Sequence, residues 1–221
     1  MPKPKSSNEL KNASYELFIA ALSILSIFNL FLYWLVPNNE ANILGVIDIM
    51  NAIFSVIFLT DFSFRLYSAT SRSGYFFRQF GWADLLASLP FPQFKILRFF
   101  RIFRAARIMK KYGARKLIRM FLASRGGSAL LTILLLIILL LEFAGMAILI
   151  VEKNSPSVNI KTPSDAIWWI LVTVTTVGYG DRFPVTNAGR FIGVIVMFTG
   201  IGLVGVLTGF LANAFLAPKK K

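Results

Sequence analysis

The chain lacks several features that would mark a secreted protein or a transporter. It has no cysteine, so disulfides are absent and cysteine usage says nothing about the redox compartment. No small-residue cleavage pattern follows the first apolar run, which is also too long for a signal peptide, so this run is predicted to be a retained membrane span. No internal repeat is visible, whereas many transporters are built from repeated halves.

Apolar residues, by contrast, dominate the composition. They make up 56% of the 221 residues, whereas soluble domains are about 45–50% apolar. Several runs reach the roughly 20 residues that cross a bilayer, which indicates an integral membrane protein with little room for a soluble domain. The net charge of +14 would suggest nucleic-acid binding in a soluble protein. Here the charge lies between apolar runs and follows membrane topology, so no nucleic-acid partner is expected.

The hydropathy pattern predicts an all-α integral membrane protein with six crossing helices. The predicted crossings are residues 14–36, 43–69, 80–89, 94–111, 128–151 and 191–216, and a shorter apolar helix at 166–176 precedes the last one. Between the fourth and fifth crossings, residues 112–125 are basic and amphipathic. The loops hold 13 Lys and Arg residues on one side and 4 on the other, so the positive-inside rule places both termini in the cytoplasm.

Residues 94–111 carry a cation at every third position, with almost only apolar side chains between the cations. The row consists of Lys95, Arg98, Arg101, Arg104, Arg107 and Lys110. On a helix these cations follow one track, along which each can take the place of its neighbour. A helix that lies on anionic lipid is the alternative interpretation.

Cations within a membrane need acidic partners, and the preceding segments offer them. Asp61 lies in the second predicted crossing and Asp84 in the third, while Asp48 and Asn51 lie about three turns further outward. Moving one elementary charge through the membrane field is worth about 2.3 kcal/mol per 100 mV. The pattern therefore predicts a charged helix that responds to voltage. A structural ion pair that serves folding alone is the alternative for Asp61 and Asp84.

The stretch TTVGYGDRFP at residues 175–184 follows the short apolar helix. Non-helical backbone at membrane depth is tolerated only where protein buries it or a water-filled cavity adjoins it. Gly178 and Gly180 relax the limits on φ and allow the carbonyls of residues 176–179 to face one axis. Rings of such carbonyls can replace the hydration shell of a monovalent cation. One chain supplies only part of each ring, so a homotetramer is expected; a simple tight turn is the alternative.

This stretch resembles the selectivity filter of potassium channels. Together with the cation row and its acids, it makes the chain similar, over about residues 14–216, to six-helix voltage-gated potassium channels of the prokaryotic type. The resemblance implies that the filter binds K⁺ and that no cofactor is needed beyond the permeant K⁺ ions. The implied K⁺-binding residues are Thr176, Val177, Gly178, Tyr179, Gly180 and Asp181.

The resemblance also implies roles for residues outside the filter. It implies a charge-transfer centre of Phe58, Asp61 and Asp84, filter support by Trp168, Trp169 and Glu152, and a hinge at Gly200. We add the apolar side chains of Leu207, Phe210 and Leu211 as candidates for a gate that closes by dewetting. Interfacial aromatics are the alternative for the tryptophans, and close helix packing is the alternative for Gly200. Glu142, near mid-bilayer, is expected to be protonated, paired with a sensor arginine or hydrogen-bonded.

These observations combine into one expected organisation. We expect a cytoplasmic N-terminus (1–13), a four-helix voltage-sensor domain (14–111), an amphipathic linker (112–125), a two-helix pore domain with a re-entrant pore helix (126–217) and a basic tail (218–221). The expected protein is a passive, voltage-gated, potassium-selective channel, not an enzyme. It is expected as a homotetramer in the plasma membrane, in contact with lipids that include anionic ones. A potassium channel with weak voltage dependence or with ligand or lipid gating, and a non-selective cation channel, are the alternatives.

Overall fold

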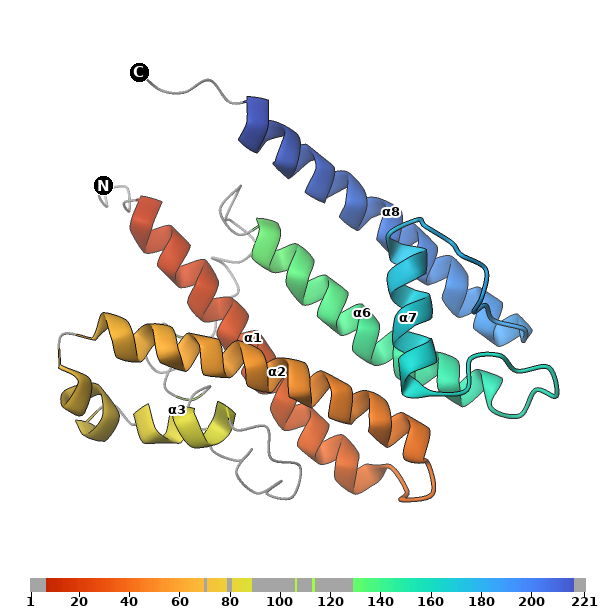
Figure 1. Cartoon of the computed structure of the whole chain (residues 1–221), viewed down its shortest axis with the longest axis horizontal. Coiled ribbons are helices and arrows are strands. Elements are labelled where there is room, and N and C mark those ends of the chain that lie inside the picture. Colours follow the sequence, from red (N-terminus) through yellow and green to blue (C-terminus); the bar gives the residue numbers. More distant parts are fainter. Residues whose placement is uncertain are drawn as a thin grey trace. The chain divides into compact units, whose positions relative to one another are not determined.

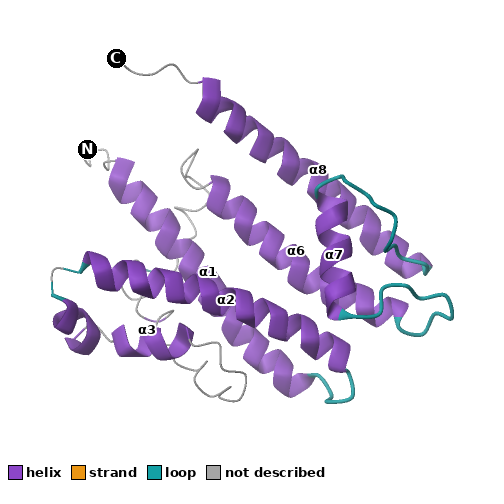
Figure 2. Ribbon diagram, in the orientation of Figure 1, coloured by secondary structure: helices purple, strands orange, loops and turns teal. Residues whose placement is uncertain are grey.

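The computed structural model describes residues 7–69, 71–78, 81–88, 106, 113 and 129–216, and every regular element in these ranges is helical (Figures 1 and 2). The elements are α1 (Ser7–Leu35), α2 (Ala41–Ser68), a π-helical turn η1 (Gly74–Arg78), α3 (Gly81–Ser88), α6 (Ala129–Glu152), α7 (Pro163–Val174) and α8 (Asn187–Leu216). The prediction of an all-α protein is therefore confirmed for the described residues.

Four of the described helices are long and apolar enough to cross a membrane. They are Ser14–Leu35, Ala41–Ser68, Leu130–Glu152 and Asn187–Asn213, which correspond to the first, second, fifth and sixth predicted crossings. α3 has only 8 described residues, and α7, with 12, is the predicted half-span. The cation row and, apart from Gly113, the amphipathic linker at 112–125 lie outside the described residues.

The chain divides into two compact units, which are described separately. The first comprises Met1–Pro37 with Ile47–Ser128, and the second comprises Asn38–Val46 with Ala129–Lys221. In the first unit, α1 and α2 bury large apolar side chains, among them Ile19, Leu22, Met50 and Phe54. Burial of these side chains away from lipid requires tight packing, because the bilayer itself provides no hydrophobic driving force between helices.

In the second unit, α6, α7 and α8 all contact one another. A capping box fixes the start of α7: the Thr162 side chain accepts from the N–H of Asp165, and the Asp165 side chain accepts from the N–H of Thr162. Pro163 occupies the first turn, where its missing N–H costs nothing. Its buried side chains include Trp169 and Ile170. The short helix is thus held at its start by its own sequence and along its length by the two longer helices.

At Gly200, α8 closely approaches the end of α7. A Cβ atom at this position would lie 2.7 Å from the Cα and 2.9 Å from the carbonyl oxygen of Val174. A Cβ at Gly202, two residues further along α8, would meet nothing within 4 Å. Close helix packing therefore accounts for the glycine at position 200, and α8 is continuous through it. A hinge at Gly200 stays a prediction.

We expect Gly200→Ala to destabilise the protein and Gly202→Ala, its matched control, not to. The first substitution forces α8 away from the Val174 backbone, a kind of overpacking that costs about 1–3 kcal/mol. The second adds a better helix former at an open site, which is worth up to about 1 kcal/mol. Thermal unfolding midpoints of the purified protein measure both effects. Equal midpoints for the two variants would show that the close approach is not present in solution.

Candidate functional site

The turn that follows α7 has an alternating backbone. Positive φ angles occur at Thr176 (62°), Gly178 (60°) and Gly180 (79°), and not at Val177 or Tyr179 between them. Such alternation turns successive peptide groups so that their carbonyls can face one side. Glycine adopts positive φ readily, but a β-branched residue such as Thr176 does so only under strain of about 1–3 kcal/mol. The sequence indicated the glycines and did not indicate the conformation of Thr176.

The start of this turn is hydrogen-bonded back to the last turn of α7. The N–H of Thr176 donates to the carbonyl of Thr173 at 3.0 Å, and the N–H groups of Val177 and Gly178 both donate to the carbonyl of Val172, at 3.1 and 3.3 Å. Within the described part of the chain, none of the carbonyl oxygens of residues 176–179 accepts a hydrogen bond. The first three amides of the turn are therefore satisfied locally, and a row of acceptors is left available, which is what coordination of a cation requires.

The outer end of the turn is braced by Trp168. Its indole ring stacks on the ring of Tyr179 with the centroids 5.7 Å apart, and its Nε1 donates to Asp181 Oδ2 at 2.8 Å. Trp169, the other tryptophan predicted to support the filter, is buried and lies against α8, where a Cβ at Gly193 would come within 3.6 Å of its ring. Within one chain, Trp168 contacts the turn and Trp169 contacts α8.

Glu152 connects the end of α6 to the segment that leads into α8. Its fully buried carboxylate accepts hydrogen bonds from the N–H groups of Val185 and Thr186, both at 2.9 Å, and from the Thr186 hydroxyl at 2.7 Å. A Cβ at Gly189 would clash with the carboxylate, so a larger residue there would displace Glu152 from these hydrogen bonds. Glu152 therefore positions the chain beyond the turn, and does not contact the turn itself.

Arg182, directly after the turn, makes contacts that the sequence did not reveal. Its guanidinium pairs with Asp165 at 3.0 Å and donates to the carbonyl of Asn159 at 2.8 Å. The Asn159 side chain in turn accepts from the N–H of Phe183 at 3.3 Å. These contacts tie the outer part of the turn to the start of α7, and the only signal for them in the sequence is the capping-box pattern at Thr162 and Asp165.

The carboxyl of Asp165 is held in its charged form. Partial burial acts to raise the pKa of Asp165, but hydrogen bonds from the backbone N–H groups of Lys161 and Thr162 act in the opposite direction. The Thr162 hydroxyl and the positive charge of Arg182 add to this effect. As a result the pKa of Asp165 lies below its ordinary value of 3.8.

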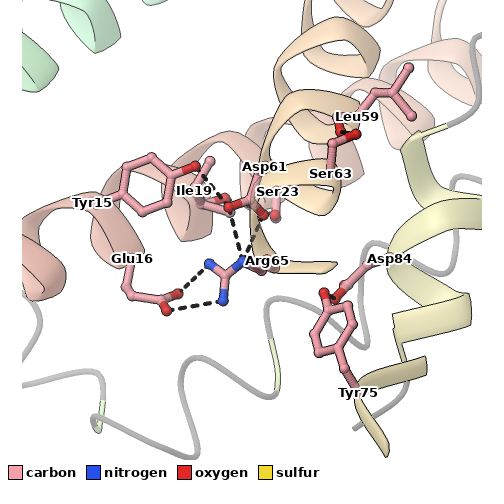
Figure 3. A network of polar contacts seen from close by, with 10 residues as sticks. All are labelled: Tyr15, Glu16, Ile19, Ser23, Leu59, Asp61, Ser63, Arg65, Tyr75 and Asp84. Atoms are coloured by element: carbon pink, nitrogen blue, oxygen red, sulfur yellow. Dashed lines mark hydrogen bonds and ion pairs between the residues drawn. The ribbon is translucent and has the colours of Figure 1, made fainter. Parts of the chain in front are cut away.

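In the first unit, the acid Asp61 is buried within a network that links α1 and α2 (Figure 3). Both of its oxygens accept from Arg65 Nε, at 2.9 and 3.0 Å, and one accepts from the Tyr15 hydroxyl at 2.8 Å. The same guanidinium forms a bidentate pair with Glu16, at 3.1 and 2.9 Å. Tyr15 and Glu16 are functional candidates that the sequence did not indicate, because they lie far from Asp61 along the chain.

The other predicted members of the charge-transfer centre lie in the same unit. Asp84 is buried on α3 and accepts from the Tyr75 hydroxyl at 3.0 Å (Figure 3). Phe58 is fully buried one turn before Asp61, with its ring 6.5 Å from that of Phe54. Polar or charged side chains buried in membrane helices are costly and usually functional.

A strip of buried polar side chains runs along α1 and α2. Its members are Ser23, Ser26, Asn29, Asn51 and Ser55. Ser26 donates to the Asn51 side chain at 3.4 Å, and Asn51 donates to the carbonyl of Ile47 at 2.8 Å. Further along, the Tyr33 hydroxyl donates to Asp48. Of the predicted outer partners, Asn51 therefore lies in the buried strip, while Asp48 is exposed and accepts from Tyr33.

The remaining predicted residues lie on α6 and α8. Glu142 is fully buried in the middle of α6. Leu207, Phe210 and Leu211 lie in the C-terminal half of α8, and Leu211 is exposed within the single chain. Only 22% of the apolar window of α8 is buried, so this helix offers most of its surface to lipid or to other chains.

Comparison with known proteins identifies the family. The family described as “Ion transport protein” matches residues 12–220 of the chain. The chain belongs to the ion transport protein family. Its four long apolar helices indicate a multi-pass membrane protein. The family match indicates a channel rather than an enzyme. The predicted family is thereby confirmed.

Several relatives of this ion transport protein are similar over shorter stretches. A voltage-gated potassium channel from Aeropyrum pernix is 44% identical over 89 residues, which cover 40% of this chain and 28% of the relative. The calcium-gated potassium channel TvoK from Thermoplasma volcanium is 49% identical over 57 residues, covering 26% and 16%. A cyclic nucleotide-gated potassium channel from Mesorhizobium japonicum is 37% identical over 70 residues, covering 32% and 20%. The chain thus spans less than a third of the length of each of these relatives.

We expect Asp165→Asn to destabilise the protein at neutral pH by about 1 kcal/mol, because it weakens the capping box and the pair with Arg182. Since the folded-state pKa is lowered, the carboxylate contributes fully above pH 3.8, and this contribution is lost as the pH falls through the lowered value. Thermal unfolding of wild type and variant at several pH values should show a difference that narrows in acid. A difference that is independent of pH would contradict this role of the charge.

Proposed function

We propose that this ion transport protein is a potassium-selective channel. The observation that carries the proposal is the turn at residues 176–180, whose alternating φ angles and unoccupied carbonyls suit coordination of a dehydrated monovalent cation. In this proposal Thr176, Val177, Gly178 and Tyr179 supply the oxygens, while Gly180 and Asp181 complete the outer end. The relatives named above are potassium channels that differ in what opens them, which supports a shared conduction site.

The proposed assembly is a homotetramer around the turn. In a single chain Val177 is 54% exposed, Tyr179 68% and Phe198 of α8 74%. Large apolar side chains beside a water-filled pathway would be unfavourable if they stayed uncovered. Further copies of the chain, arranged around one axis, would cover them and close the rings of carbonyls. The assembly is proposed to lie in the plasma membrane with both termini in the cytoplasm.

We assign voltage sensing to residues 14–111 and conduction to residues 126–217, joined by the linker at 112–125. The buried acids Asp61 and Asp84 and the polar strip on α1 and α2 support this assignment, because they offer counter-charges and polar groups along a path through an apolar bundle. The six cations from Lys95 to Lys110 would move along that path. Calcium or cyclic nucleotide gating, named for two relatives, is the second candidate.

The gate is proposed to lie on α8, beyond its contact with α7. Leu207, Phe210 and Leu211 would narrow the inner mouth of the tetramer and exclude water when closed. On the C-terminal side of Gly200, α8 contains Gly205 and Gly209, and a Cβ at either position would meet nothing within 4 Å. The described residues of the same chain therefore do not pack against α8 at these two glycines.

Purified protein in a planar bilayer under opposed K⁺ and Na⁺ gradients should give currents that reverse at the potassium equilibrium potential. Gly178→Ala should abolish selectivity or conduction, because alanine resists the positive φ of 60° found there. Gly202→Ala is the matched control and should leave the reversal potential unchanged. Currents that reverse midway between the K⁺ and Na⁺ potentials would identify a non-selective channel and overturn the selectivity.

Voltage steps on the same bilayers test the sensor. Arg101→Gln and Arg104→Gln should each make the conductance–voltage relation shallower, since each charge moved through the field is worth about 2.3 kcal/mol per 100 mV. Arg190→Gln, which removes an exposed cation at the start of α8, should leave the slope unchanged. Gating currents that are the same in wild type and both sensor variants would remove voltage sensing and leave ligand gating as the function.

A further inference from the structure

A cavity of about 160 Å³ lies in the second unit, away from the turn. It is bounded by the first turn of α2, the last turns of α6 and the loop before α7. The side chains that line it are Asn42, Leu149, Lys153, Val158, Ile160 and Lys161. None of these residues has a role in the proposed conduction or sensing.

The lining has an apolar floor and a cationic rim. Leu149 and Ile160 are buried side chains of the floor, while Lys153 and Lys161 are exposed. Lys153 follows Leu149 by one helical turn, directly after the apolar span ends at Glu152. The cavity therefore lies where the hydrocarbon of a bilayer gives way to its headgroups.

The start of α2 adds to the positive potential of the rim. Asn42 is the second residue of this long helix. The N–H groups of Ile43 and Leu44 bond to the carbonyl of Glu40, at 3.0 and 3.1 Å. The positive end of the helix dipole remains directed outward at this first turn, where negatively charged groups are stabilised.

Of the two lysines that line the cavity, one is paired with a carboxylate and the other is not paired with any carboxylate among the described residues. Lys153 pairs with Glu40 at 2.5 Å. Asp165 accepts from the backbone N–H of Lys161, but its charge is matched by Arg182 at 3.0 Å. Among the described residues, no carboxylate pairs with the ammonium group of Lys161. A bound anion would therefore satisfy Lys161 and share Lys153 with Glu40.

We propose that this cavity binds the phosphate headgroup of an anionic phospholipid, with the first methylene groups of the acyl chains against Leu149, Val158 and Ile160. The two lysines and the start of α2 recognise the phosphate, and the apolar floor distinguishes a lipid from a free anion. A soluble phosphate ion would leave this floor in contact with water. The position at the end of two membrane spans supplies the lipid at high local concentration.

Occupation of the cavity would bear on the start of α7. Lys161 directly precedes Thr162, the N-cap of that helix. On the other side, Gly45 of α2 lies so close to Pro163 that a Cβ there would come within 2.5 Å of the proline Cγ. A lipid held by Asn42 and Lys161 would thus join the two segments that meet at the first residue of α7.

Native mass spectrometry of the purified protein with dioctanoyl-phosphatidylglycerol or dioctanoyl-phosphatidylcholine tests the site. We expect the wild type to retain the anionic lipid more strongly than the zwitterionic one. Each of Lys153→Gln and Lys161→Gln should weaken binding of the anionic lipid roughly five-fold, and the double variant should remove the preference. Equal binding of the two lipids to the wild type, or an unchanged preference in the double variant, would overturn the proposal.

Two further variants and one competitor sharpen the test. Glu40→Gln frees Lys153 from its pair and should tighten binding of phosphatidylglycerol, whereas a purely structural role of Glu40 predicts no gain. Arg190→Gln, an exposed cation elsewhere in the same unit, should bind like the wild type. Displacement of the lipid by an equal concentration of inorganic phosphate would overturn a lipid site in favour of a free-anion site. The measured quantity is lipid binding and not conduction, so failure of the lipid-site proposal can be distinguished from failure of the proposed channel function.

Discussion

The requirement that backbone polar groups be satisfied inside a membrane underlies the rest of this structure. α-Helices meet this requirement internally, which is why every regular element among the described residues is helical. The turn at 175–180 departs from it in a controlled way, because its first amides donate to the end of α7 and its carbonyls are left over. Those carbonyls can be satisfied by a cation. The same constraint therefore explains the helical scaffold and why, among the described residues, the free carbonyls of this turn need a partner from outside the chain.

The turn depends on supports of two kinds. Trp168 and the α7 carbonyls contact it directly, while Glu152 and the Arg182–Asp165 pair hold the chain beyond it. Several of these supports are charged or polar groups in partly or fully buried positions, where a charge is stable only with its hydrogen-bond partners. The contact between Gly200 and Val174 adds a steric support from α8. A backbone as strained as that at Thr176 persists when its surroundings over-determine it in this manner.

Patterns of short range were sufficient to predict much of this protein. Apolar runs predicted the four long helices, the paired glycines predicted the turn, and Asp61 and Asp84 stood out because acids are rare in apolar segments. The partners of these residues could not be predicted. Tyr15 and Glu16 are 46 and 49 residues away from the groups they bind, and no local spacing specifies such a pairing. Only the contacts of Arg65 show that it bridges Asp61 and Glu16.

The sequence by itself determined that the chain is a helical membrane protein with a glycine-containing turn after a short apolar helix, because periodicity, length of apolar runs and glycine placement are local properties. Tertiary structure alone decided which tryptophan braces the turn, what Glu152 holds and why position 200 must be glycine. It also brought Lys153, Lys161 and the start of α2 around one cavity. These outcomes depend on distances between segments that are remote along the chain, and packing, not composition, sets those distances.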